Sequence, residues 1–185
     1  MCATYNDAVF RLVGIRTVRS LLVVIALLAT FAAQPAAAAS SSLQLPGDPA
    51  AASLLVAEQA LLALTNADRV ANGLQPLDFD PETLTIARVR ASSQLGVPAL
   101  SHYDANGDLA FVNMLAEAHL SYQLAGENLA RASADDPTLT ARVEQALMTS
   151  PAHRKNILEQ TFNRVAIGAA ADSHGQITFA ELYRN

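Results

Sequence analysis

Three side chains could act together in one chemical site. They are His102 in "LSHYD", Glu127 in "LAGENLA" and His153 in "TSPAHRKNIL". They are spaced by 25 and 26 residues along the chain. Two imidazoles and a carboxylate form the donor set of a three-ligand zinc site with one open position, and they also suit general acid–base chemistry. The spacing is not specific by itself, because the fold must bring the three residues together.

Each of these residues also has a simpler structural interpretation. His102 lies in an irregular loop, where it could serve a site or only hydrogen-bond the loop. Glu127 stands among apolar residues, and burying a carboxylate is costly unless a cation or backbone N–H groups pair with it. Ser150 and Pro151 suit the N-cap and first position of a helix, with the serine hydroxyl accepting the N–H of His153. On that pattern alone, His153 is a solvated residue at a helix start.

The elements that must position these residues follow from the apolar periodicity. It predicts helices over 52–73, 109–120 and 136–148, and a further helix that starts with Asp80 as N-cap and Pro81 in the first position. The segment 121–132 reads as extended, and "RVAIGAAA" and "QITFAELY" read as strands joined by the hairpin turn "DSHG". Helices followed by late strands predict an α+β domain, with helices packed on an antiparallel sheet.

The N-terminal 39 residues of the 185-residue chain have the pattern of an export signal. Three arginines precede the apolar run 21–33, and small residues offer a cleavage site near Ala38 or Ala39. The run is too short for the roughly 20 residues that span a bilayer. We therefore expect a signal peptide over 1–39, a linker over 40–53 and one domain over 54–185, with no stable membrane span after cleavage.

Charge and cysteine content narrow the functional classes. The chain has a formal net charge of −5, and removing the signal would take away three of its 12 Lys and Arg but only one of its 17 Asp and Glu. An acidic exported domain is a poor candidate for binding nucleic acid or anionic lipid. The single cysteine, Cys2, lies in the predicted signal, so the mature chain would have no disulfide, thiolate metal site or cysteine nucleophile.

The segments "LLALTNADRVANGLQPLDFDPETLTIARVRA", "LSHYD", "YQLAGENLA" and "MTSPAHRKNIL", in this order, resemble the CAP superfamily of cysteine-rich secretory, antigen 5 and pathogenesis-related-1 proteins. The similarity runs from about Leu54 to Tyr183, and its nearest form is the bacterial SCP-like extracellular domain. The resemblance implies an α-β-α sandwich of about four helices around a small antiparallel sheet. It also implies a cleft in which His102 and Glu127 match the family's first histidine and its Gly-Glu-Asn glutamate.

The sequence departs from the full family pattern at two positions. Many eukaryotic members complete a tetrad with a second glutamate and a second histidine, and the two histidines there can hold a divalent metal such as zinc. Leu147 matches the tryptophan that precedes the second glutamate, which places Ser150 at the glutamate position. The second histidine matches either Thr178 or His153, depending on the alignment. Zinc binding therefore cannot be carried over whole, and His102, Glu127 and His153 remain the candidate ligands.

Three functions fit these observations. The first is a secreted, periplasmic or extracellular binding module that uses a His/Glu cleft for a lipid, a peptide or a cell-envelope fragment. The second is a metal-assisted hydrolase of peptide or peptidoglycan bonds, in which His102, Glu127 and His153 act as ligands, acid or base. The third is a structural envelope protein in which these residues form an internal hydrogen-bond network. The sequence offers no recognisable nucleophile elbow, which weighs against covalent catalysis.

Overall fold

The structure, a computed structural model, describes residues 9–12 and 49–185. Within these ranges the chain forms five helices and five strands. The helices are α1 (Pro49–Ala71), α2 (Leu84–Ser93), α3 (Ala110–Glu117), α4 (Leu139–Thr149) and α5 (Pro151–Ile157). The strands are β1 (Val9–Leu12), β2 (Asp78–Phe79), β3 (Leu124–Ser133), β4 (Arg164–Ala171) and β5 (Gln176–Arg184). Apart from β1, the predicted signal peptide lies outside the described residues, as does the predicted linker up to residue 48.

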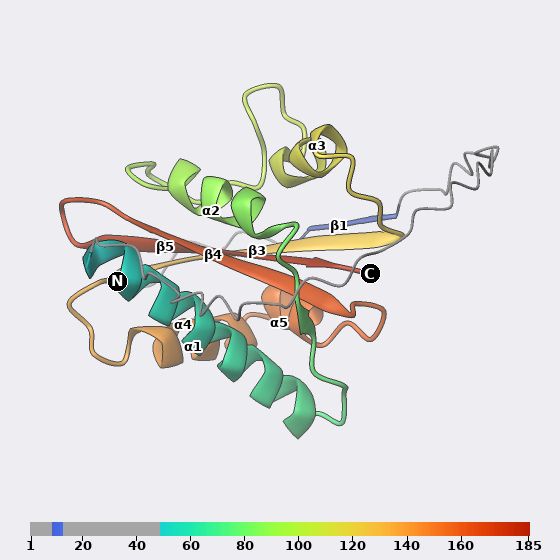
Figure 1. The fold of residues 1–185 in the computed structure, drawn as a ribbon, viewed down its shortest axis with the longest axis horizontal. Coiled ribbons are helices and arrows are strands. Elements are labelled where there is room, and N and C mark those ends of the chain that lie inside the picture. Colours follow the sequence, from blue (N-terminus) through green and yellow to red (C-terminus); the bar gives the residue numbers. More distant parts are fainter. Residues whose placement is uncertain (1–8, 13–48) are drawn as a thin grey trace, which may run out of the picture.

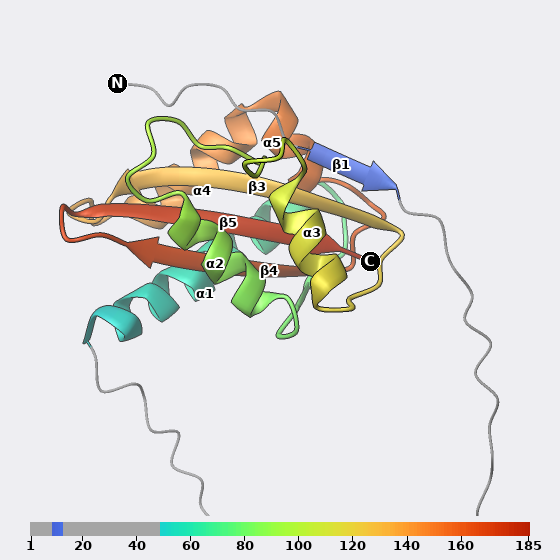
Figure 2. The ribbon, with the colours of Figure 1, turned by 90° about the horizontal axis from the view of Figure 1, so that it is seen from above.

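The helices cover both faces of a single sheet, which confirms the predicted α-β-α sandwich (Figure 1). Helices α2 and α3 pack on one face, and α1, α4 and α5 pack on the other. Figure 2 looks at the sheet through α2 and α3. The described part of the chain has one helix more than the four expected, because the stretch after α4 forms the separate short helix α5.

The sheet is mixed rather than antiparallel as predicted. Its strand order is β1-β3-β5-β4-β2, and the three pairings among β1, β3, β5 and β4 are antiparallel. Strand β2 instead runs parallel to β4, with Asp78 beside Arg164. A strand of two residues leaves no alternating pattern in the sequence, so β2 could not be foreseen from periodicity.

The hairpin formed by β4 and β5 follows the prediction, and its turn places Gly175 at a φ of +77°. Helix α2 crosses β4 closely at Gly168. A Cβ atom at this glycine would collide with the backbone of Ala87 and Arg88, so only glycine permits the observed approach. This close packing holds the following turn of α2, which carries Arg90, directly over the sheet.

Each face of the sheet has its own hydrophobic core. Between the sheet and α2–α3 the core contains Ile86, Ala87, Phe111, Val112, Leu115, Ala125, Ala166 and Leu182. Between the sheet and α1, α4 and α5 it contains Leu61, Val143, Leu147, Ile157, Phe162, Val165, Ile167, Ile177, Phe179 and Tyr183, among others. The rings of Phe162 and Tyr183 stack with their centroids 5.5 Å apart. The sheet is therefore covered by apolar side chains on both sides, as a two-faced sandwich requires.

Three helix starts differ in detail from the sequence prediction. Helix α1 begins at Pro49, so residues 49–53 of the expected linker are helical. Helix α2 begins at Leu84, because the Asp80 carboxylate accepts hydrogen bonds from Arg184 and Thr83 instead of capping the helix. Ser150 is the N-cap of α5, but its hydroxyl makes no capping hydrogen bond. Within the described residues, no helix has both the length and the hydropathy needed to cross a membrane.

Candidate functional site

Strand β3 separates the candidate residues. Successive side chains in a strand point to opposite faces, so Glu127 and Asn128 project to different sides of the sheet. Glu127 meets Arg90 of α2 and His102 on one face. On the other face, the Asn128 amide donates a hydrogen bond to the backbone carbonyl of His153, at 3.2 Å. The structure thus brings His102 and Glu127 together and places the helix that carries His153 across the sheet.

The carboxylate of Glu127 is held by two neighbours, and we call Arg90, His102 and Glu127 the Glu127 network. Arg90 donates from Nε to Oε1 of Glu127 at 2.7 Å and from Nη2 to Oε2 at 3.1 Å. Nδ1 of His102 lies 2.6 Å from Oε2. Because a carboxylate only accepts, Nδ1 carries the hydrogen, and Nε2 is left as an acceptor in the neutral ring. Arg90 also donates to the Ser101 carbonyl at 2.7 Å, which ties the histidine loop to α2.

The Glu127 network is closed to solvent. The side chains of Arg90, His102 and Glu127 are 3%, 2% and 0% exposed. Nε2 of His102 is buried and has no hydrogen-bond partner within the part of the chain that the structure describes. A bidentate arginine and a histidine donor satisfy the buried carboxylate, as a charge in a dry site requires. The arrangement can hold the loop around residues 101–103 against the sheet.

The residues present do not fit a bound metal ion. The guanidinium of Arg90 already fills the position beside Glu127 that a cation would take, and His102 uses Nδ1 on the same carboxylate. Among the described residues, no group of three or more His, Cys, Asp or Glu side chains is arranged to hold a metal. The donor set predicted from His102, Glu127 and His153 is therefore not assembled, and we derive no chemistry through zinc.

The two remaining tetrad positions, Thr178 and Ser150, also do not contact the carboxylate of Glu127. Thr178 lies on the α2 face, where its hydroxyl donates to the Ala91 carbonyl at 2.7 Å. It is four residues along β5 from Leu182, the partner of Glu127, or about 13 Å at the usual strand rise. Ser150 lies at the junction of α4 and α5, on the opposite face of the sheet.

A second buried polar group lies on the α1–α4 face, and sequence reasoning missed it. The carboxylates of Glu144 on α4 and Glu181 on β5 share one hydroxyl donor, that of Thr65. Burial, followed by the charge of Glu181, raises the pKa of Glu144 to about 9. Burial also raises the pKa of Glu181, and it raises that of the adjacent Tyr183 well above its ordinary value. Glu144 therefore keeps its proton at neutral pH.

Sequence signals for the missed residues exist. In β5, Glu181 occupies an inward position of the alternation Ile177, Phe179, Glu181, Tyr183, which marks a carboxylate in a core. In α2, Arg90 lies three residues after Ala87 and next to Ala91 on the predicted apolar face. A cation on an apolar helix face is the partner that a lone buried carboxylate needs.

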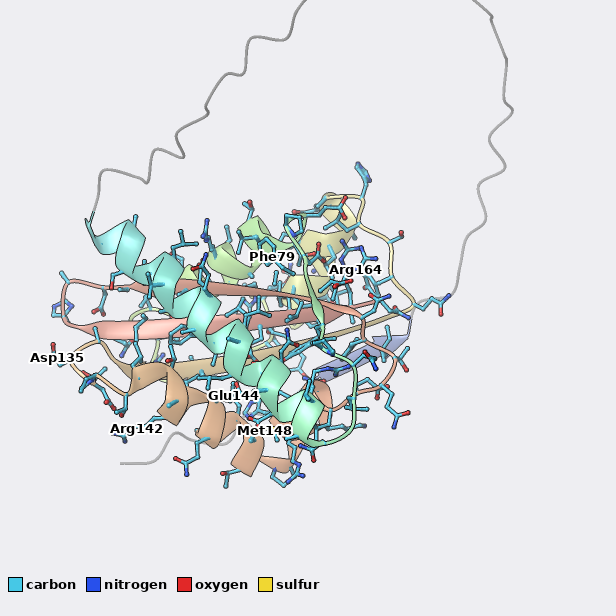
Figure 3. The ribbon with its side chains drawn as sticks, turned by 60° about the horizontal axis from the view of Figure 1, so that its bottom comes forward. Phe79, Asp135, Arg142, Glu144, Met148 and Arg164 are labelled. Atoms are coloured by element: carbon cyan, nitrogen blue, oxygen red, sulfur yellow. The ribbon has the colours of Figure 1, made fainter. Side chains whose placement is uncertain are left out.

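Two surface hollows flank α1, and we name them by their linings. The apolar hollow, of about 320 Å³, is lined by Leu55, Glu58, Gln59, Leu62, Phe79, Leu84 and Ile167. The acidic hollow, of about 330 Å³, is lined by Leu64, Asp68, Ala141, Glu144, Gln145, Met148, Thr149 and Arg154. Figure 3 shows Phe79 on one side of α1, and Glu144 and Met148 on the other side, where α4 runs beside α1.

A five-stranded mixed sheet between two helical layers, with a histidine and a glutamate joined on the α2 face, defines an α+β sandwich of the SCP type. The model of the cysteine-rich secretory protein family, CAP, matches residues 62–183. The chain belongs to this family, as the sequence motifs predicted.

The individual proteins that resemble this chain share about a third or fewer of the aligned residues with it. The Bacillus subtilis (strain 168) protein YkwD is 32% identical over 111 residues, which cover 60% of this chain and 41% of YkwD. An extracellular SCP-domain protein from Bacillus anthracis str. Ames superposes with a TM-score of 0.61 at 23% identity, covering 76% of this chain and 44% of that one. An outer surface protein from Borrelia burgdorferi gives a TM-score of 0.57 at 16% identity, with 70% of this chain and 92% of that one covered. The chain thus spans less than half of YkwD and of the Bacillus anthracis protein.

Proposed function

We propose that this CAP domain is an exported binding module that takes the apolar chain of a lipid into the apolar hollow. The observation that carries the proposal is the lining of the hollow, in which five of seven residues are apolar. Phe79, at its edge, is 51% exposed. A concave site of this size with a mostly apolar wall is the usual form of a small-molecule site. Export is supported by the N-terminal charge and hydropathy pattern and by the extracellular SCP-domain protein among the relatives.

The polar wall of the apolar hollow is compatible with an apolar occupant. Glu58 is 5% exposed and accepts hydrogen bonds from Arg88 at 2.8 and 2.6 Å and from the Ala169 N–H at 3.0 Å. Because its carboxylate already has these partners, a hydrocarbon chain can cover it without leaving a charge unpaired. Binding of the hydrocarbon chain would be stabilised because it shields leucine and isoleucine side chains from water.

The burial of the Glu127 network argues against a binding module or a hydrolase that uses His102 and Glu127 in an open cleft. His102 and Glu127 do not reach the surface, so a cleft ligand or a polymer substrate would need them to open first. Their bonds to Arg90 and to each other support a structural role for this network within a binding domain. The proposed ligand site is accordingly the apolar hollow.

The test uses two neighbouring substitutions on α1. Leu55→Trp fills the apolar hollow, whereas Val56→Trp adds the same side chain at a position that is 64% exposed and does not line it. The chain has no tryptophan, so each variant also carries a single fluorescent reporter. In calorimetric titrations with 1-decanol, we expect saturable binding to the wild type and to Val56→Trp, and at least roughly tenfold weaker binding to Leu55→Trp. Absence of binding to the wild type, or equal binding to both variants, contradicts the proposal.

A further inference from the structure

One margin of the sheet is completed by a strand that the sequence predicts to be removed. Strand β1, Val9–Leu12, pairs antiparallel with residues 124–127 of β3. Figure 2 shows β1 at the edge of the sheet, beside β3 and close to α5. All four residues of β1 lie within the predicted signal peptide 1–39. Cleavage of that signal would therefore leave this part of β3 without its neighbouring strand.

The hydrogen bonds of β3 show which of its backbone groups face this edge. The N–H of Leu124 donates at 2.9 Å to the side chain of Asn185, the residue that follows β5, and so points toward β5. Backbone groups alternate between the two edges of a strand, and the β3–β5 register is unbroken. The N–H and C=O groups of Ala125 and Glu127 therefore point away from β5. The Glu127 carbonyl agrees with this direction, because it accepts a hydrogen bond from Asn156 of α5 at 3.1 Å.

Strand β1 supplies the partners of these outward groups. Arg11 lies opposite Ala125 in the register. Val9 lies opposite Glu127 in the same way. Because the two β3 residues direct their backbone groups outward, these are the pairs that exchange N–H···O=C bonds. The backbone N–H and C=O of Phe10, between them, point away from β3. An extended segment paired in this manner is the arrangement in which protein domains bind a peptide by adding a strand to a sheet.

Helix α5 and the loop after it limit the kind of occupant at this edge. The Asn156 amide holds the Glu127 carbonyl, which is the residue where the pairing with β1 ends. At Gly126, a Cβ atom would lie 2.9 Å from Oδ1 of Asn156 and 3.1 Å from the ring of Phe162. The β3 backbone is thus packed closely from the α5 side, and the open stretch is short. The occupant that the structure shows there is one extended strand of four residues.

We propose that residues 124–127 of β3 form a strand-addition site for an extended peptide of a partner protein, and that the chain's own segment Val9–Leu12 occupies this site until the N-terminal segment is removed. The peptide runs antiparallel to β3 and exchanges backbone hydrogen bonds with Ala125 and Glu127. Its chemistry is that of β1, with three apolar residues, one cation and no proline at the two paired positions. Binding is non-covalent. The apolar hollow lies by β2 and β4 at the other edge of the sheet, so this site is independent of the lipid proposal.

The experiment titrates the full chain into a fluorescein-labelled peptide of residues 7–14 and follows fluorescence anisotropy. Arg11→Pro removes a donor of β1 and opens the site, so this variant should bind the peptide with a Kd of about 0.1 mM, as suits a few backbone hydrogen bonds. The wild type should bind about tenfold more weakly, because its own β1 competes at an effective concentration on the order of 1 mM. Phe10→Pro places the same residue where the N–H points away from β3, and it should bind as the wild type does.

Two further measurements locate the peptide on β3. A peptide N-methylated at Arg11 should bind Arg11→Pro at least about tenfold more weakly, whereas N-methylation at Phe10 should leave the affinity unchanged. The amide hydrogens of Ala125 and Glu127 should exchange faster in Arg11→Pro than in the wild type and should slow again when the peptide is added, while the β4–β5 hairpin stays protected.

Three results overturn the proposal: no saturable binding to Arg11→Pro, equal binding to Arg11→Pro and the wild type, or equal affinity of the two N-methylated peptides. Concentration-dependent dimerisation of Arg11→Pro that the peptide does not reverse would overturn it in favour of pairing between two copies of the chain.

Discussion

Replacing Glu127 by glutamine (Glu127→Gln) tests the Glu127 network with little change of volume. The substitution removes the negative charge that pairs with Arg90, whose side chain is 3% exposed, and it puts an amide donor where Arg90 or His102 now donates. Removing one partner of a buried ion pair leaves the other charge without compensation, which costs about 3 to 5 kcal/mol. The bidentate contact and the additional histidine bond favour the upper part of that range.

Thermal unfolding followed by circular dichroism, with urea unfolding at pH 7, measures this loss. At about 3 °C per kcal/mol for a domain of this size, Tm should fall by about 9 to 15 °C. Glu117→Gln, an exposed carboxylate on α3, should melt within about 1 °C of the wild type. The double variant Arg90→Met/Glu127→Leu removes both charges together and should recover part of the lost stability, because Nδ1 of His102 and the Ser101 carbonyl still lose their partners.

The reasoning fails if the free energy of unfolding of Glu127→Gln lies within about 1 kcal/mol of the wild-type value, because burying a guanidinium without a counter-ion costs more than that. It also fails if the double variant is less stable than Glu127→Gln alone. That result would assign the stability to the shape of the polar side chains and not to the balance of their charges.

Two further predictions concern Glu144 and the N-terminal segment. The pKa of Glu144 is about 9 in the folded chain against an ordinary 4.5, so the folded state keeps a proton that the unfolded chain loses, and stability falls as pH rises from about 4.5 toward 9. In urea unfolding, Glu144→Gln should leave the free energy of unfolding nearly unchanged at pH 4 and should raise it by about 3 kcal/mol at pH 7, at about 1.4 kcal/mol per pH unit. An equal gain at both pH values contradicts the raised pKa. N-terminal sequencing of the exported protein should begin directly after Ala38 or Ala39, and a start at Met1 would contradict the predicted signal peptide.

Much of the fold was predictable from local sequence signals. The apolar periodicity located four helices within a few residues, and the turn "DSHG" between two alternating runs located the β4–β5 hairpin. These features depend on neighbours in the chain, which a single sequence contains. The predicted start of α2 is wrong because the Asp80 carboxylate pairs with Arg184, a residue 104 positions away. No local sequence pattern indicates such a contact.

The candidate site was less predictable, because it depends on which face of the sheet each helix covers. His102 and Glu127 were paired through a family resemblance, and the structure adds Arg90 as their counter-ion. His153 was grouped with them by residue type and spacing, but its helix packs against the opposite face of β3. The sharing of Thr65 by Glu144 and Glu181 joins α1, α4 and β5, so it emerges only when all three elements are in place.

The alternation of Glu127 and Asn128 along β3 has a consequence for how the strand aligns during folding. A slip of one residue would turn every β3 side chain to the wrong face. A slip that moves Glu127 into the place of Asn128 would put its carboxylate with Glu181 and Glu144, while Arg90 would face Gly126, which has no side chain to pair with it. Three carboxylates together and a cation left alone would add an electrostatic penalty to the hydrophobic one. The charges of the two polar clusters thus favour the correct register of β3, and they disfavour the misaligned sheet more strongly than apolar packing alone would.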